Sequence, residues 1–207
     1  MSVWASIILA GGESRRMGQS KGLLPVKGEP LLKKLVGVVQ PFSEHIIVVA
    51  REEEKKEIRR SLPQLNNLVV ITDEPRFKGK GPLAGMQAGM SLRLADYYFV
   101  CACDLPCLDQ SFIAGLKSCV AENGGYAAYI PVEAERYQPL AAVYQPIQSI
   151  IESLLRQNEL KWTALLNRLS TYYLIEEREW RGWSKVSNPF FNMNTPDDYN
   201  KIRSGCV

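Results

Sequence analysis

The feature that most constrains this chain is an apolar, β-favouring run, Val3 to Leu9, that breaks at two glycines, Gly11 and Gly12. Glycine lets the backbone of such a turn adopt positive φ and approach a ligand closely. Successive backbone N–H groups in this kind of turn form a concave anion site. Arg16 and Lys21 follow within ten residues of the glycines and add full positive charges. The pattern predicts a strand, a turn and a phosphate site.

The glycine spacing differs from that of the two better-known glycine loops. Gly12 is followed by Glu-Ser-Arg-Arg-Met-Gly-Gln, so G-x-x-x-x-G-K-[ST] is absent, and so is G-x-G-x-x-G. A plain turn with solvated basic residues is the alternative for any isolated pair of glycines. The whole string Leu-Ala-Gly-Gly-x-Ser-x-Arg-Met-Gly-x-x-Lys is much more specific than such a pair, and it favours a nucleoside triphosphate ligand.

Strand-length apolar runs alternate with helical patterns through residue 122. This alternation predicts a mainly parallel, doubly wound α/β sheet. Strands are expected at Val3 to Leu9, Ile46 to Ala50, Leu68 to Ile71 and Tyr97 to Cys101. Helices are expected from Pro30, from Glu52, over the stripe Leu83 to Leu94, and after a cap at Asp109.

The C-terminal half is expected to contribute an antiparallel portion of the sheet. Its expected elements are strands at Tyr126 to Val132, Leu140 to Tyr144 and Thr171 to Ile175, and helices from Pro146 and over Trp162 to Leu169. Trp180 to Val186 is expected to be a loop, without a role that its residues reveal. Thr195 and Pro196 suit the N-cap and first position of a last helix. No linker or repeat is evident, so one domain, residues 1–207, is expected.

The composition argues against several classes of protein. The chain has 207 residues and a formal net charge of +3, too weak to indicate nucleic acid or an anionic membrane as partner. No apolar run approaches the ~20 residues that span a bilayer. The N-terminus lacks the features of a signal peptide. We therefore expect a cytoplasmic protein, a monomer, that binds neither nucleic acid nor membrane.

Three of the five cysteines crowd together, at Cys101, Cys103 and Cys107. A zinc site would need further ligands, and the only histidine is His45. Along a strand, Cys101 and Cys103 point to the same face, as small buried residues often do. Buried, reduced thiols are the expected state.

Polar groups suited to a nucleotide follow three of the predicted strands. The first strand leads to Gly11 to Lys21, the third to Asp73 and the fourth to Asp104. Because ligands of open α/β sheets bind at the carboxyl ends of the strands, these groups are expected to share one edge.

Several of these residues have a structural alternative. Asp104 follows a buried strand, where a carboxylate is costly to desolvate unless it is paired, and a bound Mg²⁺ would satisfy it. It could instead be a turn or cap residue, and Asp73 could be a simple turn former. Asn192 and Asn194 flank Met193 on one face of an extended segment, where they could cap the last helix or line a metal and phosphate site.

Gly85 and Gly89 lie four residues apart within a predicted helix, where glycine costs ~1 kcal/mol relative to alanine. Something must approach that helix closely, either a neighbouring strand or a ligand. Close packing is the expectation for Gly89, and proximity to a ligand is the expectation for Gly85.

The chain resembles the molybdenum cofactor guanylyltransferases, a family of nucleotidyltransferases. The resemblance covers most of the sequence, and it is carried by the opening string, Thr72-Asp73, Gly81-Pro82-Leu83-Ala84-Gly85, Cys103-Asp104-Leu105-Pro106 and Asn192-Met193-Asn194-Thr195-Pro196. It implies a Rossmann-like, three-layer nucleotidyltransferase fold.

The resemblance also implies roles for individual residues. The nucleotide site would comprise Leu9, Ala10, Gly11, Gly12, Lys21, Asp73, Gly81, Pro82, Gly85 and Asp104. Mg²⁺ would be held by Asp104 and Asn194, and the catalytic residues would be Arg16, Lys21 and Asp104. The segment Arg136-Tyr137-Gln138-Pro139 is similar to the family's substrate-side hairpin, and Arg136 and Asn192 would lie on that side. Family members often have an asparagine at the end of the second strand, where this chain has Val49 and Ala50.

The implied reaction is transfer of GMP from GTP to the terminal phosphate of molybdopterin, or of its molybdenum-loaded form, with release of pyrophosphate. The attacking phosphate monoester, with a second pKa of ~6, is largely ionised at pH 7 and needs no general base. This agrees with a lone histidine that lies away from every motif. Other cofactor-biosynthesis proteins would be possible partners.

Two alternatives stay open from the sequence. A cytidylyltransferase of the same fold would more often have Leu-Ala-Ala-Gly where this chain has Leu-Ala-Gly-Gly. A non-catalytic nucleotide-binding module could dispense with Asp104 and the two asparagines.

Overall fold

The computed structural model describes residues 2–12 and 20–204. Its main sheet has the strand order β10-β7-β9-β6-β1-β4-β5, and β8 pairs with β7 outside this path. The strands are β1 (Trp4–Leu9), β4 (His45–Val49), β5 (Leu68–Ile71), β6 (Tyr97–Ala102), β7 (Ala128–Glu133), β8 (Arg136–Tyr137), β9 (Ala141–Tyr144) and β10 (Tyr173–Ile175). A separate hairpin joins β2 (Pro25–Val26) to β3 (Glu29–Pro30).

Four strands, β6, β1, β4 and β5, run parallel to one another, and the other strands add the antiparallel portion. β9 is antiparallel to both β6 and β7, whereas β10 is parallel to β7. β7 therefore ends at the same edge of the sheet as β6. The predicted fold class, a mostly parallel α/β sheet with antiparallel strands in the C-terminal half, is confirmed.

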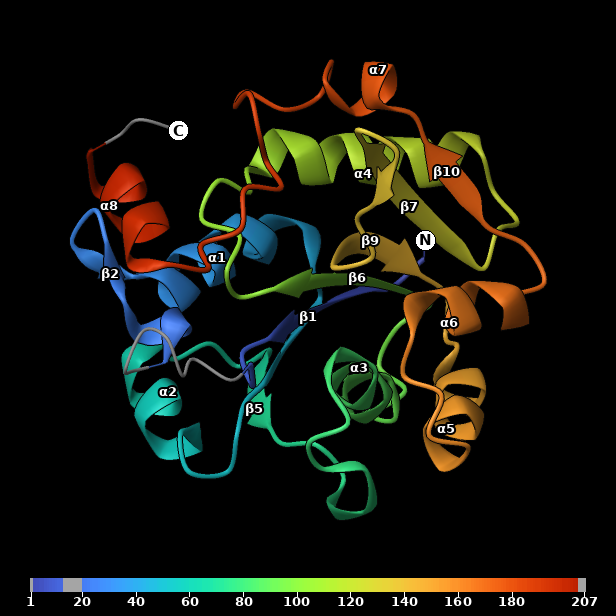
Figure 1. The fold of residues 1–207 in the computed structure, drawn as a ribbon, viewed down its shortest axis with the longest axis horizontal. Coiled ribbons are helices and arrows are strands. Elements are labelled where there is room, and N and C mark those ends of the chain that lie inside the picture. Colours follow the sequence, from blue (N-terminus) through green and yellow to red (C-terminus); the bar gives the residue numbers. More distant parts are fainter. Residues whose placement is uncertain (1, 13–19, 205–207) are drawn as a thin grey trace.

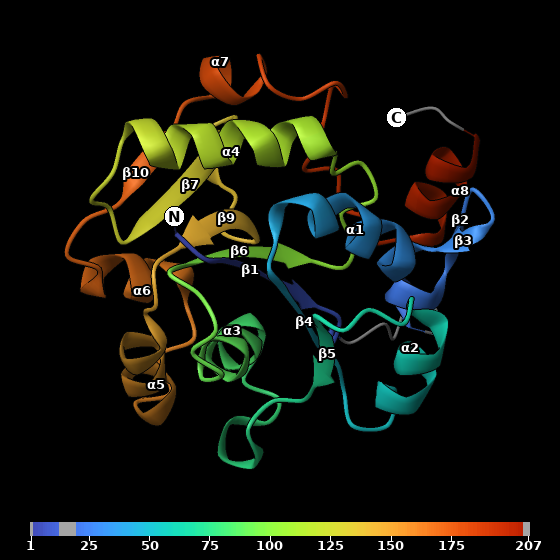
Figure 2. The same cartoon turned by 180° about the vertical axis from the view of Figure 1, so that it is seen from behind.

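Helices cover both faces of the sheet and make three layers (Figures 1 and 2). One hydrophobic core lies under α1 (Leu31–Val39), α2 (Lys55–Ser61), α4 (Gln110–Glu122) and α8 (Pro196–Ser204). A second core lies under α3 (Pro82–Met90), α5 (Gln148–Arg156) and α6 (Trp162–Arg168). Strands β1, β4 and β6 are buried along most of their length because layers of side chains cover them on both faces.

Both predicted helix caps are confirmed. The Asp109 carboxylate accepts a hydrogen bond from the Phe112 N–H at 2.9 Å at the start of α4. The Thr195 hydroxyl accepts one from the Asp198 N–H at 3.1 Å, and Pro196 is the first residue of α8. Side-chain oxygens thus satisfy N–H groups that would otherwise lack a partner within the helix.

Some predicted boundaries are wrong. Pro30 pairs with Pro25 in the β2–β3 hairpin, so α1 begins at Leu31. α2 begins at Lys55 rather than Glu52, because the preceding residues form a turn. α3 ends at Met90, short of the predicted stripe. The four-residue α7 (Glu177–Trp180) occupies a stretch for which no helix was predicted, and Glu176 and Glu179 form its capping box.

The segment from Trp180 to Val186, whose role the sequence did not reveal, is a strap over the start of α4. The Trp180 indole N–H donates to the Val132 carbonyl at 2.8 Å. Trp183 packs so closely on Gly115 that a Cβ there would lie 2.3 Å from its ring. The Ser184 hydroxyl donates to the second carboxylate oxygen of the α4 cap at 2.6 Å.

No helix within residues 2–12 and 20–204 has the length and apolar character needed to cross a lipid bilayer.

Candidate active site

The carboxyl edge of the four parallel strands places equivalent residues in one line. Leu9, Val49, Ile71 and Ala102 are level with one another across the sheet. The residues two positions later, in spatial order, are Asp104, Gly11, Arg51 and Asp73. At ~4.8 Å per strand, these four positions span about 14 Å. The predicted meeting of the strand-end groups at one edge is confirmed.

Lys21 lies between Asp104 and Asn194. Its ammonium donates to Asp104 Oδ2 at 3.0 Å and to Asn194 Oδ1 at 2.7 Å. The lysine and aspartate side chains are 15% and 19% exposed, so this ion pair is only partly screened by water. A basic residue from the opening loop, the carboxylate after β6 and an amide from near the C-terminus thus form one cluster.

Backbone hydrogen bonds fix the segment that carries Asp104. The Cys103 N–H donates to the Leu9 carbonyl at 3.0 Å, which attaches the loop after β6 to the end of β1. The Met193 N–H donates to the Asp104 carbonyl at 2.9 Å, which attaches the segment before α8 on the other side. Because Thr195 supplies the cap of α8, the Asn194 side chain is available to the cluster with Lys21.

The donor set at Asp104 fits a Mg²⁺ ion. Asp104 Oδ1 is buried and has no hydrogen-bond partner within residues 2–12 and 20–204. A buried carboxylate oxygen without a partner is costly, and a hard cation with oxygen ligands would satisfy it. Mg²⁺ commonly takes one or two protein oxygens and completes its shell with water and phosphates. Asn194 Oδ1 is the second oxygen at this place.

Asp73 is half-buried at the opposite end of the line of strand-end residues. Its Oδ2 accepts a hydrogen bond from the Gly79 N–H at 3.4 Å. Burial raises the pKa of the Asp73 carboxyl, and the Gly79 N–H and the charge of Lys78 partly offset this effect. The loop then reaches Gly81, whose φ of +74° favours glycine, and α3 begins at Pro82.

The two glycines of α3 both face β1. A Cβ on Gly89 would lie 2.7 Å from Ile7, so the predicted close packing is confirmed. A Cβ on Gly85 would lie 2.7 Å from the Leu9 side chain and 3.7 Å from Asp73 Oδ1. Close packing therefore also accounts for Gly85, and its contact with a nucleotide stays a prediction.

The remaining predicted residues lie as follows. Ala10 is buried and donates its N–H to the Val49 carbonyl at 2.7 Å, whereas Gly11 and Gly12 are exposed. Arg136 is exposed on the β8 hairpin, at the edge where β7 ends. Asn192 is exposed, and its amide donates to the Phe190 carbonyl at 3.0 Å rather than to the Lys21 cluster. Arg16 lies outside the described residues.

Arg51 and Glu54 also lie at this edge, although neither was among the predicted site residues. The Arg51 guanidinium forms an ion pair with Glu54, and its Cγ lies 3.7 Å from where a Cβ on Gly11 would stand. Glu54 Oε2 is buried without a hydrogen-bond partner in the described part of the chain. The available signal was the position of Arg51 just after a parallel strand, but it precedes a run of charged residues, from Glu52, that was predicted as a helix.

Among the described residues, Cys101, Cys103 and Cys119 are buried, free thiols, and Cys107 is a half-buried free thiol. Burial, and then the charge of Asp104, raises the pKa of Cys103 to about 12. No group of three or more His, Cys, Asp or Glu side chains suited to a metal ion occurs among residues 2–12 and 20–204. A metal site here would therefore depend on the carboxylate and amide oxygens near Lys21.

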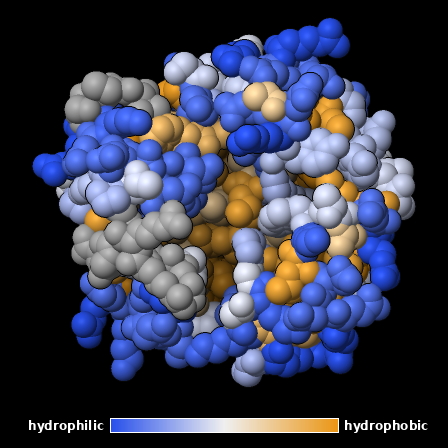
Figure 3. Space-filling model, in the orientation of Figure 1, coloured by the Kyte–Doolittle hydropathy of each residue, from blue (hydrophilic) through white to orange (hydrophobic). Residues whose placement is uncertain are grey.

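The face shown in Figure 3 is hollowed at its centre. Hydrophobic residues form the floor of this hollow, and hydrophilic residues border much of it (Figure 3). Such a combination of an apolar floor and polar borders is common in sites for small organic ligands.

Comparison with known proteins assigns the chain to a family. Residues 6–171 match the model of the MobA-like NTP transferase domain. The chain is 34% identical over 201 residues to a protein of Bacillus velezensis named "Probable molybdenum cofactor guanylyltransferase", covering 95% of this chain and 93% of the relative. It is 30% identical over 200 residues to a protein of the same name from Bacillus cereus, covering 96% and 95%.

A solved structure agrees with these relatives. The molybdopterin-guanine dinucleotide biosynthesis protein A of Archaeoglobus fulgidus superposes with a TM-score of 0.80 at 28% identity, over 98% of both chains. Together with the strand-end geometry, these matches show that the chain belongs to the MobA-like NTP transferase family of nucleotidyltransferases.

Proposed function

We propose that this protein transfers GMP from GTP to the terminal phosphate of molybdopterin, or of its molybdenum-loaded form, and releases pyrophosphate. The observation that carries the proposal is the convergence of Lys21, Asp104 and Asn194 at the carboxyl edge, in line with Gly11 and Asp73. The names of the Bacillus relatives support guanine as the base and the molybdenum cofactor as the acceptor.

In this reaction a phosphate oxygen of molybdopterin attacks the α-phosphorus of GTP. A new P–O–P bond forms, the bond from the α-phosphorus to the bridging oxygen breaks, and pyrophosphate leaves with that electron pair. The attacking monoester, with a second pKa of ~6, is already largely ionised at pH 7, so no side chain has to remove a proton. The protein's task is to align the two phosphates and to offset their charge.

The chain's own groups divide this task. Backbone N–H groups of Gly11 and Gly12 would bind phosphate oxygens, with Leu9 and Ala10 at the base of the turn. Lys21 would turn from Asp104 to the same oxygens, and Arg16 would add a second positive charge. Asp73, with Gly81, Pro82 and Gly85, would bound the nucleoside end. Arg136 and Asn192 would face the pterin substrate.

Asp104 and Asn194 would hold Mg²⁺, which neutralises phosphate charge and orients the triphosphate when it is bound. In the structure, the Lys21 ammonium supplies positive charge beside the same carboxylate. If Mg²⁺ took the place of the ammonium beside Asp104, Lys21 would be able to contact the nucleotide.

The test is incubation of the protein with molybdopterin, MgCl₂ and each of the four nucleoside triphosphates in turn, followed by mass analysis of the products. The guanine dinucleotide of molybdopterin, formed with GTP alone, is the expected product. Formation of the cytosine dinucleotide with CTP would show the cytidylyltransferase alternative. Absence of any dinucleotide and of pyrophosphate release would show a non-catalytic nucleotide-binding module.

A further inference from the structure

A second pocket lies behind the loop that carries Asp104. It has a volume of about 480 Å³, and it lies between α1, the start of α4, the β2–β3 turn, the strap and α8. Of the described residues that line it, none belongs to the Lys21–Asp104–Asn194 cluster. The volume is within the range of small-molecule sites, ~300–1,000 Å³. The proposed reaction does not use this pocket.

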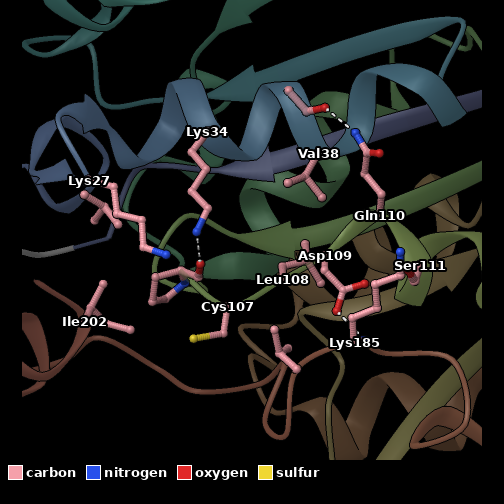
Figure 4. A pocket seen from close by; sticks show the side chains of 14 residues that line it. Lys27, Lys34, Val38, Cys107, Leu108, Asp109, Gln110, Ser111, Lys185 and Ile202 are labelled. Carbon is pink, nitrogen blue, oxygen red and sulfur yellow. Dashed lines mark hydrogen bonds between the residues drawn. The ribbon is translucent and has the colours of Figure 1, made fainter. Parts of the chain in front are cut away.

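Three lysines line the pocket: Lys27, Lys34 and Lys185. Figure 4 shows the Lys27 and Lys34 side chains directed toward the same space beside Cys107. Within the described part of the chain, none of the three ammonium groups has a carboxylate oxygen within 4.0 Å. Like charges directed into one cavity repel each other, and an anion between them would relieve that repulsion.

The pocket's one aspartate is already engaged. Asp109 caps α4 with Oδ1, and its Oδ2 accepts hydrogen bonds from the Ser184 hydroxyl and the Lys185 N–H, at 2.6 and 3.2 Å. The helix terminus is therefore not the feature that attracts an anion. Lys185 lies beside Asp109, whereas Lys27 and Lys34 together place a charge of about +2 at their end of the pocket, which matches a phosphate monoester of −1.5 to −2.

The rest of the lining combines apolar side chains with two polar ones, Gln110 and Ser111. Val38, Leu108 and Ile202 face the space beside the lysines and would accept a ring or another apolar group. We propose that this pocket is a second anion site, which binds the phosphate of a small organic molecule between Lys27 and Lys34, with Lys185 at the other end of the pocket, independently of the nucleotide at Lys21.

The pocket is connected to the candidate active site by one hydrogen bond. The Lys34 ammonium donates to the Pro106 carbonyl at 2.7 Å, and Pro106 is two residues after Asp104. An anion that draws the ammonium away from this carbonyl would loosen the loop. Such an anion is expected to lower turnover without competing with GTP.

Pyridoxal 5′-phosphate is a suitable probe because it is an organic phosphate whose aldehyde condenses with a lysine amine, with loss of water, to an imine. Borohydride reduces the imine to a stable amine, and peptide mass analysis locates it. With saturating GTP and Mg²⁺ present, the label is expected on Lys27, Lys34 or Lys185, and excess inorganic pyrophosphate is expected to suppress it. Equal labelling of surface lysines such as Lys56 and Lys161, or label on Lys21 that GTP removes, contradicts a second site.

Pyridoxal without the phosphate is the control for amine reactivity. Burial lowers the pKa of Lys34, which increases its neutral, reactive fraction whether or not the pocket binds phosphate. Labelling by pyridoxal at least tenfold weaker than by the phosphate form supports a phosphate site. Equal labelling by both reagents would show a reactive lysine only.

A matched pair of variants separates site binding from general charge. The Lys27→Met/Lys185→Met protein should bind pyridoxal 5′-phosphate at least tenfold more weakly in the presence of GTP. The Lys56→Met/Lys161→Met protein loses the same charge at exposed positions outside the pocket and should bind as wild type does. Equal weakening in both, or none in the first, overturns the proposal. Neither result depends on whether GMP transfer occurs.

Discussion

The two halves of the chain contribute to the candidate active site in different ways. In the N-terminal half, the four parallel strands end level with one another, and each is followed two residues later by a residue of the site. These residues are Gly11, Arg51, Asp73 and Asp104. In the C-terminal half, the Asn194 side chain pairs with Lys21 across 173 residues of sequence, and the neighbouring Met193 N–H donates to the Asp104 carbonyl. The register of the strands fixes the positions of the strand-end residues, whereas packing between distant segments fixes the position of Asn194.

This difference has a consequence for mutation. Loss of a strand-end group should remove chemistry and leave the fold intact, because the sheet holds the backbone there. Loss of a C-terminal contact should mainly change alignment, because that half closes over a site that is already formed. Substitutions at four positions, each with its control where the chain offers one, follow from the largest expected effect to the smallest.

Asp104→Ala and Asp104→Asn should both lower turnover by at least ~10³-fold, about 4 kcal/mol in the barrier. Each removes the carboxylate charge, whereas the asparagine variant keeps the shape and an acceptor for Lys21. Pyrophosphate release measures turnover, and thermal unfolding should show a change within ~1 kcal/mol because the ion pair is partly exposed. Near-wild-type transfer by the asparagine variant would rule out a metal at this carboxylate.

Asn194→Ala should lower kcat/KM by roughly 10- to 100-fold, since a hydrogen bond to a charged group contributes about 1.5–3 kcal/mol. Asn192→Ala is the control from the same segment, because its amide bonds the nearby Phe190 carbonyl. It should leave the KM for GTP unchanged, and if Asn192 faces the pterin it should raise only the KM for that substrate. Combining Asn194→Ala with Lys21→Met should give less than the sum of the two single effects. Full additivity would mean that the bond between the halves does not matter to catalysis.

The same contrast explains what the sequence could predict. Asp73 and Asp104 could be placed because the end of a strand and its neighbours in a parallel sheet are local properties. Arg51 could have been placed by that rule, but a run of charges hid it. The position of Asn194 depended on whether Thr195 capped α8, which the residue types alone left open.

The strap could not be predicted at all. Its contacts, Trp180 with Val132 and Trp183 with Gly115, join distant segments, and α7 is too short to show helical periodicity. Packing of this kind is fixed only once the sheet has formed.

Gly89→Ala should destabilise the fold by up to about 2 kcal/mol, because overpacking costs about 1–3 kcal/mol and the gain in helix propensity offsets only ~1 kcal/mol of it. Its Cβ would lie within 3.2 Å of three atoms of Ile7. Gly85→Ala is the matched change one helical turn earlier, where a single Leu9 methyl lies at 2.7 Å and can rotate away. Its stability should therefore change little, whereas displacement of Leu9 should weaken GTP binding. Urea unfolding and GTP titration of both variants measure these effects, and equal losses of stability would show that Gly85 is purely a packing residue.

Asp73→Asn should have the smallest effects, a gain in the stability of the fold and a loss of affinity for GTP. Because burial raises the pKa of Asp73 in the folded protein, the folded state holds its proton to higher pH than the unfolded state does. The contribution of Asp73 to the free energy of unfolding is thus fully present below the ordinary aspartate pKa. It is lost as the pH rises through the raised pKa of Asp73 in the folded protein. At pH 7 the asparagine variant should be more stable by a few tenths of a kcal/mol, or about 1 °C in Tm. The gap should close as pH falls below the ordinary aspartate pKa.

The same variant should bind GTP roughly fivefold more weakly, since a neutral acceptor replaces a charged one. Gain of stability with loss of affinity is the result expected of a carboxylate that the protein keeps desolvated for a ligand rather than for its fold. A variant that is less stable at pH 7 and binds GTP as wild type does would instead identify Asp73 as a turn former, held in place by its hydrogen bond from Gly79. In that case the nucleoside end of the site would have to be assigned to the neighbouring strand end, at Arg51.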